Sequence, residues 1–274
     1  MLDISIVVPA IRQNRWADLY NSIKLSASKL NWELILVSPF DLPPELQNID
    51  NLRLLKSHSS VSICIQLGSL EAKGKLLYHT VDDCVMFPDS INKAHQLYQQ
   101  CCGHKDVVNM RYREGKNFSG YEFPMNFWKV SSANDLRAPG INPDWFWSVQ
   151  PLLNKNYFVE LGGLDCRFEY SNHGHHDLLF RIQKDDGRVF QSPTEVSNAD
   201  HMPNITGDHA PIHYAQTQHD EPLFFELYNE YTDRIRIPYD NYKQYPELMI
   251  WKRRFPDKHT DSYVELTKER GYNI

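Results

Sequence analysis

ISIVVPA, residues 4–10, is an almost unbroken apolar run, rich in β-branched side chains, that stops at a proline. Because it lacks the alternation of a half-exposed strand, it predicts a strand buried on both faces of a sheet. WELILVSP (residues 32–39) has the same character and is also broken by a proline. NLRLLKS (51–57) and KLLYHTV (75–81) are candidates for two further strands. The first 81 residues therefore predict four strands, of which the first two are deeply buried.

Segments with the spacing of helices lie between and after these strands. Residues 15–30 place apolar side chains about one helical turn apart. VSICIQLGSLEAKG (61–74) predicts a second helix that ends at Gly74. A third, DSINKAHQLYQQCC (89–102), follows Pro88. This alternation predicts an α/β fold with a mixed, mostly parallel central sheet flanked by helices, in which ligands bind beyond the carboxyl ends of the strands.

The second half of the chain has a less regular pattern. From Val107 onward the pattern predicts antiparallel strands, and a helix is expected from about His176 to Lys184. The last fifty residues again have helical character. We therefore expect one domain over residues 1–220 and a helical C-terminal extension over residues 221–274 packed on it.

The composition narrows the classes of function. The 274 residues carry a formal net charge of -6, which argues against a general nucleic-acid-binding protein. The five cysteines are an odd number without a CxxC pair, so reduced thiols in a cytosol-like compartment are expected. The sequence shows neither a basic leader nor an apolar run of membrane-spanning length. We expect a cytoplasmic, soluble protein that is at most peripheral to a membrane.

The segment MIWKRRF (249–255) combines basic and aromatic residues and is a candidate for contact with an anionic membrane. A solvated helix face or a contact with a second copy of the chain would give the same composition. A homo-oligomer therefore stays open.

Two adjacent carboxylates, Asp82 and Asp83, follow the strand predicted at residues 75–81. One interpretation is a turn or a helix cap, where aspartate is common. The other is a site at which carboxylates hold a hard divalent cation against an anionic ligand. The ends of the first two strands, at Ala10 and Ser38, are expected at the same edge of the sheet, which favours the second interpretation.

The order of six short motifs along the chain indicates the class of protein more specifically than the aspartate pair alone. The segments follow one another as ISIVVPA, ELILVS, LGSLEAKGKLLYHTVDDC, ELGGLDCRF, HDLLFRI and DDGRV. Their order and spacing resemble those of family 2 glycosyltransferases over residues 3–201. The resemblance implies a GT-A-like, Rossmann-related fold. It also implies a hexosyltransferase-like enzyme of polysaccharide biosynthesis, which moves a sugar from a nucleotide-sugar donor to a hydroxyl of a glycan or glycoconjugate acceptor, with inversion and with Mn²⁺ or Mg²⁺.

The resemblance places Asp82 and Asp83 at the D-x-D motif, where the family holds the donor diphosphate through a cation. It implies a metal site formed by Asp83 and His201. The residues that it implies for the donor nucleotide are Pro9, Ala10, Arg12, Ser38, Gln66 and Asp82. Cys84 stands where the family has its last aspartate. Because a thiol is an unusual ligand for a hard cation, metal dependence stays open.

The base that takes the acceptor proton is implied near the helix of HDLLFR. The family's acidic pair falls on Gly174 and His175, so His175 and Asp177 are the candidates for catalysis. Alternatively, Asp177 caps its helix and the histidines before it form a polar loop. Further histidines in the next segment have no spacing that indicates zinc; they are His209, His213 and His219.

The acceptor is implied to bind near ELGGLDCRF and the aromatic segment ahead of it. Trp145 and Trp147 are candidates because aromatic faces pack against the apolar faces of sugar rings. Asp165 could reach an acceptor hydroxyl. The alternative for the two tryptophans is an ordinary place in the core.

Two other functions stay open. A degenerate module that binds a nucleotide sugar or a glycan without turnover would account for Cys84 and for the missing acidic pair. A nucleotidyltransferase would also need carboxylates and a nucleotide pocket, but the sequence has no glycine-rich phosphate loop of the G-x-G-x-x type.

Overall fold

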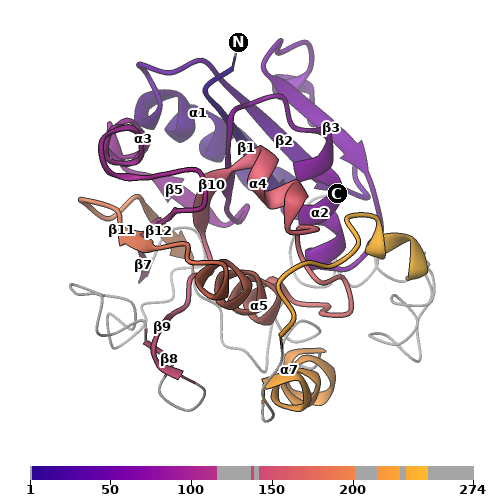
Figure 1. Cartoon of the computed structure of the whole chain (residues 1–274). Coiled ribbons are helices and arrows are strands. Elements are labelled where there is room, and N and C mark those ends of the chain that lie inside the picture. Colours follow the sequence, from indigo (N-terminus) through magenta and orange to yellow (C-terminus); the bar gives the residue numbers. More distant parts are fainter. Residues whose placement is uncertain (1, 116–136, 139–141, 201–214, 229–232, 246–274) are drawn as a thin grey trace.

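The structure, a computed structural model, describes residues 2–115, 137–138, 142–200, 215–228 and 233–245. A seven-stranded sheet with the order β11-β6-β10-β4-β1-β2-β3 lies at its centre (Figure 1). Its strands are β1 (Ile4–Pro9), β2 (Trp32–Ser38), β3 (Leu52–Lys56), β4 (Leu76–His79), β6 (Val107–Asn109), β10 (Pro151–Asn154) and β11 (Val189–Gln191). All four strands predicted in the first 81 residues are present, and the mixed, mostly parallel sheet is confirmed.

The segment ISIVVP forms β1, which pairs in parallel with β2 on one side and with β4 on the other. Residues 4–8 and all of β2 are buried, as their unbroken apolar sequences predict. β3 lies at the edge of the sheet, and only its Leu52 is buried. The edge position explains why β3 tolerates the charged residues Arg53 and Lys56.

Helices cover both faces of the sheet (Figure 1). They are α1 (Trp16–Ser26), α2 (Val61–Glu71), α3 (Ser90–Cys101), α4 (Lys155–Glu160) and α5 (Ser171–Lys184). Ile4, Ile6 and Val8 of β1 pack with α1 and α3. Val7 points to the opposite face and packs with α2, α4 and α5. The two-residue period of the strand thus divides the apolar core into two layers.

Two helix ends differ from the sequence-based expectation. α1 begins after a 3-10 turn at Gln13–Arg15 and ends at Ser26, four residues before the predicted end. α2 ends at Glu71, so the prediction that Gly74 caps it was wrong. A Cβ atom at Gly74 would lie 2.4 Å from the backbone nitrogen of Ser5. Gly74 is therefore explained by the close approach of this loop to β1.

The start of α5 also differs, with consequences for the site. α5 begins at Ser171, five residues before the predicted start at His176. The segment SNHGHH is thus the first part of the helix, and the alternative that it forms a polar loop was wrong. Asp177 lies in the middle of the helix, so it does not cap it.

β10 runs antiparallel to both of its neighbours, β4 and β6. Because of this reversal, the residues that enter β10 lie beside the carboxyl end of β4. Gln150 shows the contact directly, since its Oε1 accepts hydrogen bonds from Tyr78 Oη at 2.9 Å and Thr80 Oγ1 at 3.0 Å. The segment before β10, which contains Trp145 and Trp147, therefore reaches the edge of the sheet where Asp82 and Asp83 follow β4.

Smaller elements surround this edge. A three-stranded sheet has the order β5-β12-β7, and a two-stranded one joins β8 to β9. Their bounds are β5 (Cys84–Met86), β7 (Tyr112–Gly115), β8 (Arg137–Ala138), β9 (Asn142–Phe146) and β12 (Ser197–Asp200). The expectation of antiparallel strands after Val107 was correct only in part, because β6 pairs in parallel with β11 and β7 pairs in parallel with β12.

The C-terminal part contains α7 (Glu221–Tyr228), preceded by a π-helical turn at Gln216–Asp220, and a 3-10 turn at Asn241–Gln244. Residues 233–238 have no regular secondary structure. The predicted membrane contact at residues 249–255 lies outside the described residues, as does the rest of the predicted extension from residue 246. Within the described ranges, no helix combines the length and the apolar character needed to cross a membrane.

Candidate functional site

Asp82 lies at the carboxyl end of β4 and holds the loop that follows β1. Its Oδ2 accepts hydrogen bonds from the backbone nitrogens of Ile11, at 2.7 Å, and Arg12, at 2.6 Å. Trp16 Nε1 donates to the same oxygen at 3.2 Å, and the Arg12 guanidinium binds Oδ1. Asp82 is buried, and both of its oxygens are used. The carboxylate therefore fixes the β1–α1 loop.

Asp83 shares the guanidinium of Arg12. Arg12 Nη2 lies 3.4 Å from Asp83 Oδ2, so one cation bridges the two adjacent carboxylates. All three side chains are buried. Asp82, Asp83 and Arg12, together with Pro9 and Ala10 at the end of β1, thus meet at one edge, as the sequence predicts for strand ends.

Ser38, at the end of β2, is buried, and its hydroxyl accepts a hydrogen bond from the backbone nitrogen of Phe40 at 3.0 Å. It shapes the turn after β2 at the same edge of the sheet, because β1 and β2 are parallel and Pro9 pairs with Val37. The proposed nucleotide residues Pro9, Ala10, Arg12 and Ser38 are therefore neighbours in the fold.

The side chains around Asp82 and Asp83 can be compared with what a divalent cation requires of its ligands. Asp82 has both oxygens bound by N–H donors, and Cys84 is a buried thiol whose pKa burial raises to about 12. A neutral thiol is a poor ligand for Mn²⁺ or Mg²⁺. His201, the predicted partner of Asp83 in metal binding, lies outside the described residues. In the described part of the chain no three histidine, cysteine or acidic side chains form a metal-binding group.

Gln66 was predicted at the donor nucleotide, but its amide is bound elsewhere. Its Nε2 donates to the carbonyl oxygens of Gly162, at 3.1 Å, and Tyr239, at 2.8 Å. Its Oε1 accepts from the backbone nitrogen of Leu164 at 2.9 Å. Gly163 has a φ of +71°, and a Cβ there would lie 2.1 Å from Gln66 Oε1. Gln66 therefore joins α2 to the GGLD loop and to the C-terminal segment, so its hydrogen-bonding groups are not at the strand edge.

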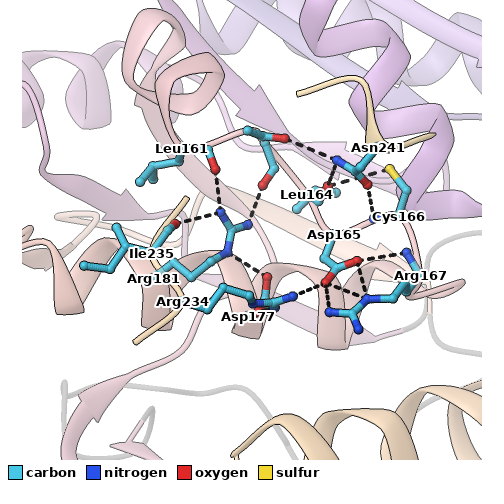
Figure 2. A network of polar contacts seen from close by, with 12 residues as sticks. Leu161, Leu164, Asp165, Cys166, Arg167, Asp177, Arg181, Arg234, Ile235 and Asn241 are labelled. Atoms are coloured by element: carbon cyan, nitrogen blue, oxygen red, sulfur yellow. Dashed lines mark hydrogen bonds and ion pairs between the residues drawn. The ribbon is translucent and has the colours of Figure 1, made fainter. Parts of the chain in front are cut away.

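Figure 2 shows a second network of carboxylates and arginines below this loop. Asp165, the predicted acceptor residue, is buried and binds Arg167, with 2.7 Å between Nη2 and Oδ2, and Arg234. Burial by itself would raise the pKa of Asp165, but the hydrogen bonds from Arg167 and the charge of Arg234 outweigh it and lower the pKa to about 2. Asp165 therefore carries a negative charge that two guanidinium groups balance.

Asp177, one of the two predicted catalytic residues, is fully buried in the same network (Figure 2). Arg181 Nε donates to its Oδ2 at 2.8 Å, Tyr228 Oη donates to its Oδ1 at 2.7 Å, and Arg234 binds Oδ1 as well. Arg181 also donates to the carbonyl oxygen of Leu161 at 2.9 Å. The carboxylate thus connects α5 and α7 to the segment 233–238.

His175, the other predicted catalytic residue, points toward the sheet. Its Nε2 lies 3.0 Å from His79 Nδ1, and His79 Nε2 lies 2.9 Å from Ser69 Oγ. Burial lowers the pKa of His175 to about 3 and that of His79 well below its ordinary value. Both imidazoles are therefore neutral at physiological pH, and the chain of hydrogen bonds ties α5 to the last residue of β4.

The predicted acceptor tryptophans are partly buried and pack against α5. The ring of Trp147 stacks on His176 with 4.5 Å between centroids, and Trp145 lies 4.9 Å from Phe180. Both belong to an aromatic cluster with Phe168 that also contacts α7. The segment that carries the two tryptophans thus contacts α5 through its aromatic rings and reaches β4 through Gln150.

Sequence reasoning missed several residues that the structure brings together here, among them Arg234, Glu169 and Asp220. Arg234 bridges Asp165 and Asp177 from 69 and 57 residues away in the sequence. Asp220 binds the backbone nitrogens of Glu169 and Tyr170 over a similar separation. No local pattern marks such long-range pairs.

No protein-family model matches the chain, and no curated protein matches it in sequence. Solved structures do match its fold. S. aureus TarS is 11% identical with a TM-score of 0.53, over 96% of this chain and 45% of TarS. The structure of TarS 1–349 is 13% identical with the same TM-score, over 96% of this chain and 74% of that one.

GalNAc-T7, solved with UDP, GalNAc and Mn²⁺, is 13% identical with a TM-score of 0.56, over 99% of this chain and 58% of that one. The chain thus spans about half the length of full TarS and of GalNAc-T7. These likenesses confirm the expected GT-A-like fold. At such identities they establish the fold alone. Membership of family 2 stays a prediction.

Proposed function

We propose that the chain is a glycosyltransferase that moves a sugar from a nucleotide-sugar donor to a hydroxyl of a glycan or glycoconjugate, with inversion. The observation that carries the proposal is the meeting of the β1 loop and the aspartate pair at the carboxyl edge of a GT-A-like sheet. Two solved structures of similar fold support it, since TarS 1–349 was solved with UDP and GalNAc-T7 with UDP and GalNAc.

In this proposal the donor nucleotide lies against the ends of β1 and β2. Asp82 orients the loop through two backbone N–H groups, so that Pro9, Ala10 and Arg12 present a fixed surface. Such fixed geometry lowers the entropic cost of bringing the reactants together. Asp82 is then a positioning residue, and Asp83 is the second carboxylate that contacts the Arg12 guanidinium.

Metal dependence remains part of the proposal only as a prediction. Asp83 and His201 would contribute ligands to Mn²⁺ or Mg²⁺. GalNAc-T7 was solved with Mn²⁺, which favours testing that ion first. If EDTA leaves turnover unchanged and Mn²⁺ does not raise it, the predicted cofactor is wrong while the proposed transfer stands.

The acceptor side consists of the aromatic surface of Trp145 and Trp147 and the loop that Asp165 holds. Because Asp165 and Asp177 are bound by arginines, we assign them the role of holding the loop and α5 in place. We assign His175 a similar role, since its ring is bound to His79. Sugar rings would pack on the remaining faces of the tryptophans.

Turnover tests the proposal directly. The chain is incubated with UDP-GalNAc, and in parallel with UDP-glucose and GDP-mannose, each with a panel of methyl glycosides as acceptors. We expect release of the nucleoside diphosphate that depends on an acceptor. Asp83→Asn should lower this rate by roughly 100-fold, because it removes one of the two carboxylates that hold the Arg12 guanidinium, the cation beside the departing phosphate. The matched control, Glu195→Gln, removes the carboxylate of the exposed Arg113–Glu195 pair and should not change it.

Thermal unfolding with the same nucleotides separates this proposal from the alternative. A ligand that binds the folded chain raises the unfolding midpoint. A shift without any turnover would favour the degenerate binding module, for which the fully bound carboxylates Asp82, Asp165 and Asp177 are the supporting observation. Neither a shift nor turnover with any of the three donors would contradict both functions.

A further inference from the structure

His219 and Asp220 form a dyad at the start of α7. His219 Nδ1 lies 2.8 Å from Asp220 Oδ1. The side chain of His219 is 31% exposed, whereas that of Asp220 is fully buried. The imidazole therefore has one nitrogen bound to a carboxylate, and its ring is accessible to solvent.

The carboxylate of this dyad is held in place by the backbone of another segment. Asp220 Oδ1 accepts a hydrogen bond from the backbone nitrogen of Glu169 at 2.9 Å, and Oδ2 accepts one from Tyr170 at 2.7 Å. Glu169 Oε1 lies 3.9 Å from His219 Nδ1, which adds a second acidic group on the same side of the ring. With an acceptor oxygen at Nδ1, the proton of the neutral imidazole resides on Nδ1, and Nε2 keeps its lone pair.

The local backbone is unusual at this position. Residues Gln216–Asp220 form a π-helical turn that continues directly into α7. π-Helical turns are rare and are frequent at functional sites. The turn places two adjacent residues so that Asp220 is buried while its neighbour His219 reaches solvent.

The dyad lies next to the surface proposed for the acceptor. Glu169 and Tyr170, which Asp220 binds, directly precede α5, and Phe168 before them packs with Phe224 of α7 in the aromatic cluster that includes Trp147. From this cluster α5 leads to β4 through the contact of His175 with His79. The helix α5 thus begins directly after Glu169 and Tyr170, which Asp220 binds. Through His175 it also contacts β4, the strand that precedes the aspartate pair.

We propose that His219 is the general base of the transfer, oriented by Asp220. This inference rests on the proposed glycosyltransferase function. Nε2 takes the proton of the acceptor hydroxyl while its oxygen forms a bond to the anomeric carbon of the donor sugar. The bond from that carbon to the diphosphate breaks, and the nucleoside diphosphate leaves with the electron pair. His219 then returns the proton to solvent.

The residues predicted for this task from the sequence are less suited to it. Asp177 is fully buried, with its two oxygens bound to arginines and Tyr228. His175 is buried, with Nε2 bound to His79. His219 differs from both, because its ring combines solvent access with a carboxylate that fixes its orientation.

The test compares two variants of His219 with a matched histidine elsewhere. His219→Asn keeps an N–H donor close to the position of Nδ1, so it can still bind Asp220, but it has no basic nitrogen. His219→Ala leaves space for added imidazole. His104→Ala is the control, because His104 is also exposed and lies 3.7 Å from a carboxylate, that of Glu160. Turnover is measured as release of UDP from UDP-GalNAc with a methyl glycoside acceptor, together with thermal unfolding and UDP binding by calorimetry.

We expect both His219 variants to unfold near the wild-type temperature and to bind UDP as the wild type does. Their turnover should fall at least 100-fold, the usual size of a general-base contribution. Imidazole should restore part of the turnover of His219→Ala and should leave His104→Ala unchanged. A purely structural role would not produce this rescue.

Retention of turnover within threefold in His219→Asn would overturn the inference and leave the proposed function intact. A loss of turnover that imidazole does not restore in His219→Ala, accompanied by weaker UDP binding, would assign His219 a structural role and also overturn it. Absence of turnover in the wild type with every donor tested would remove the proposed function and this inference with it.

Discussion

Asp82 at the sheet edge and Arg181 below the GGLD loop organise their surroundings in opposite ways. At the sheet edge a single carboxylate collects N–H groups, two from the backbone and one from an indole, all within residues 11–16. Below the loop a single guanidinium collects oxygens, from Asp177 and from the carbonyls of Leu161 and Ile235. The first region is held by one short segment, and the second joins three segments of the chain.

The sheet edge and the loop network differ in whether an uncharged side chain can replace the charged one at the centre. An amide oxygen can still accept from a backbone N–H, so the sheet edge should tolerate the loss of a charge. The loop network depends on a buried cation with several partners, and no uncharged side chain offers the same set of donors. The following predictions test this contrast, from the largest expected effect to the smallest.

Arg181→Ala should have the largest effect on stability. It leaves the buried carboxylate of Asp177 with one guanidinium fewer and several carbonyl oxygens without their donor. Removal of one partner of a buried ion pair costs about 3–5 kcal/mol. Chemical denaturation of the full chain measures this loss. Arg113→Ala, which breaks the exposed pair with Glu195, should cost about 0.5 kcal/mol or less. Equal losses in the two variants would show that the loop network contributes no more than a surface pair.

Acid should weaken the connection between the two regions, where His79 contacts His175. Burial lowers the pKa of His175 to about 3, whereas an unfolded histidine titrates near 6.5. Below pH 6.5 the unfolded chain takes up a proton that the folded chain does not. The stability that the buried, neutral His175 contributes is therefore complete above pH 6.5 and is lost as the pH falls toward 3. One such histidine costs about 2–3 kcal/mol between pH 6.5 and 4.5.

Denaturation curves at a series of pH values measure this loss. His175→Asn removes the titrating ring and keeps a polar partner for His79, so its stability should depend less on pH than that of the wild type. His104→Ala, which removes the ring of an exposed histidine, is the matched control. A stability that is constant from pH 7 to 4.5 would contradict the prediction.

Asp82→Ala should cost about 2–3 kcal/mol, because the N–H groups of Ile11 and Arg12 lose their acceptor in a buried place. Asp82→Asn keeps one oxygen for these donors and should cost about half as much. The two free energies of unfolding, compared by urea denaturation, test whether backbone hydrogen bonds or charge hold the sheet edge. If Asp82→Asn is as harmful as Asp82→Ala, the charge on Arg12 is the dominant partner.

Ser60→Ala should have the smallest effect. Ser60 caps α2, and its Oγ accepts a hydrogen bond from the backbone nitrogen of Ile63 at 3.3 Å. Loss of such a cap costs about 1 kcal/mol. Because α2 carries Gln66 into the loop network, the loss should appear as lower global stability without a change in the proposed binding of UDP at the sheet edge. A change in UDP affinity instead would show that the two regions are coupled through α2.

The sequence predicts the sheet well because burial on both faces requires continuous apolar runs, and β1 and β2 have them. It predicts helix ends less well, because these depend on tertiary contacts such as that of Gly74 with Ser5. The end of α2 is therefore three residues from the glycine that pointed to it. The start of α5 was missed for a similar reason, since its histidines are buried by packing that no local pattern reveals.

The candidate site likewise contains residues that local sequence predicts and residues that only tertiary contacts bring together. Asp82 and Asp83 could be found because they follow a recognisable strand. Their partner Arg12 lies 70 residues earlier, and only the fold brings it to them. Gln66 was expected at the nucleotide because of its place in a motif, but its amide binds Gly162 and Tyr239. Contacts between distant segments decide such roles, and a single sequence does not contain them.

The bridge made by Arg234 has a consequence for the order of events during synthesis. Asp177 precedes Arg234 by 57 residues. At the usual rates of translation this separation corresponds to roughly 3–11 s. During that interval Asp165 and Asp177 have their near neighbours Arg167 and Arg181 as counter-ions. These local pairs balance the charges of the two carboxylates before Arg234 has been synthesised, and Arg234 then adds the long-range bridge between them.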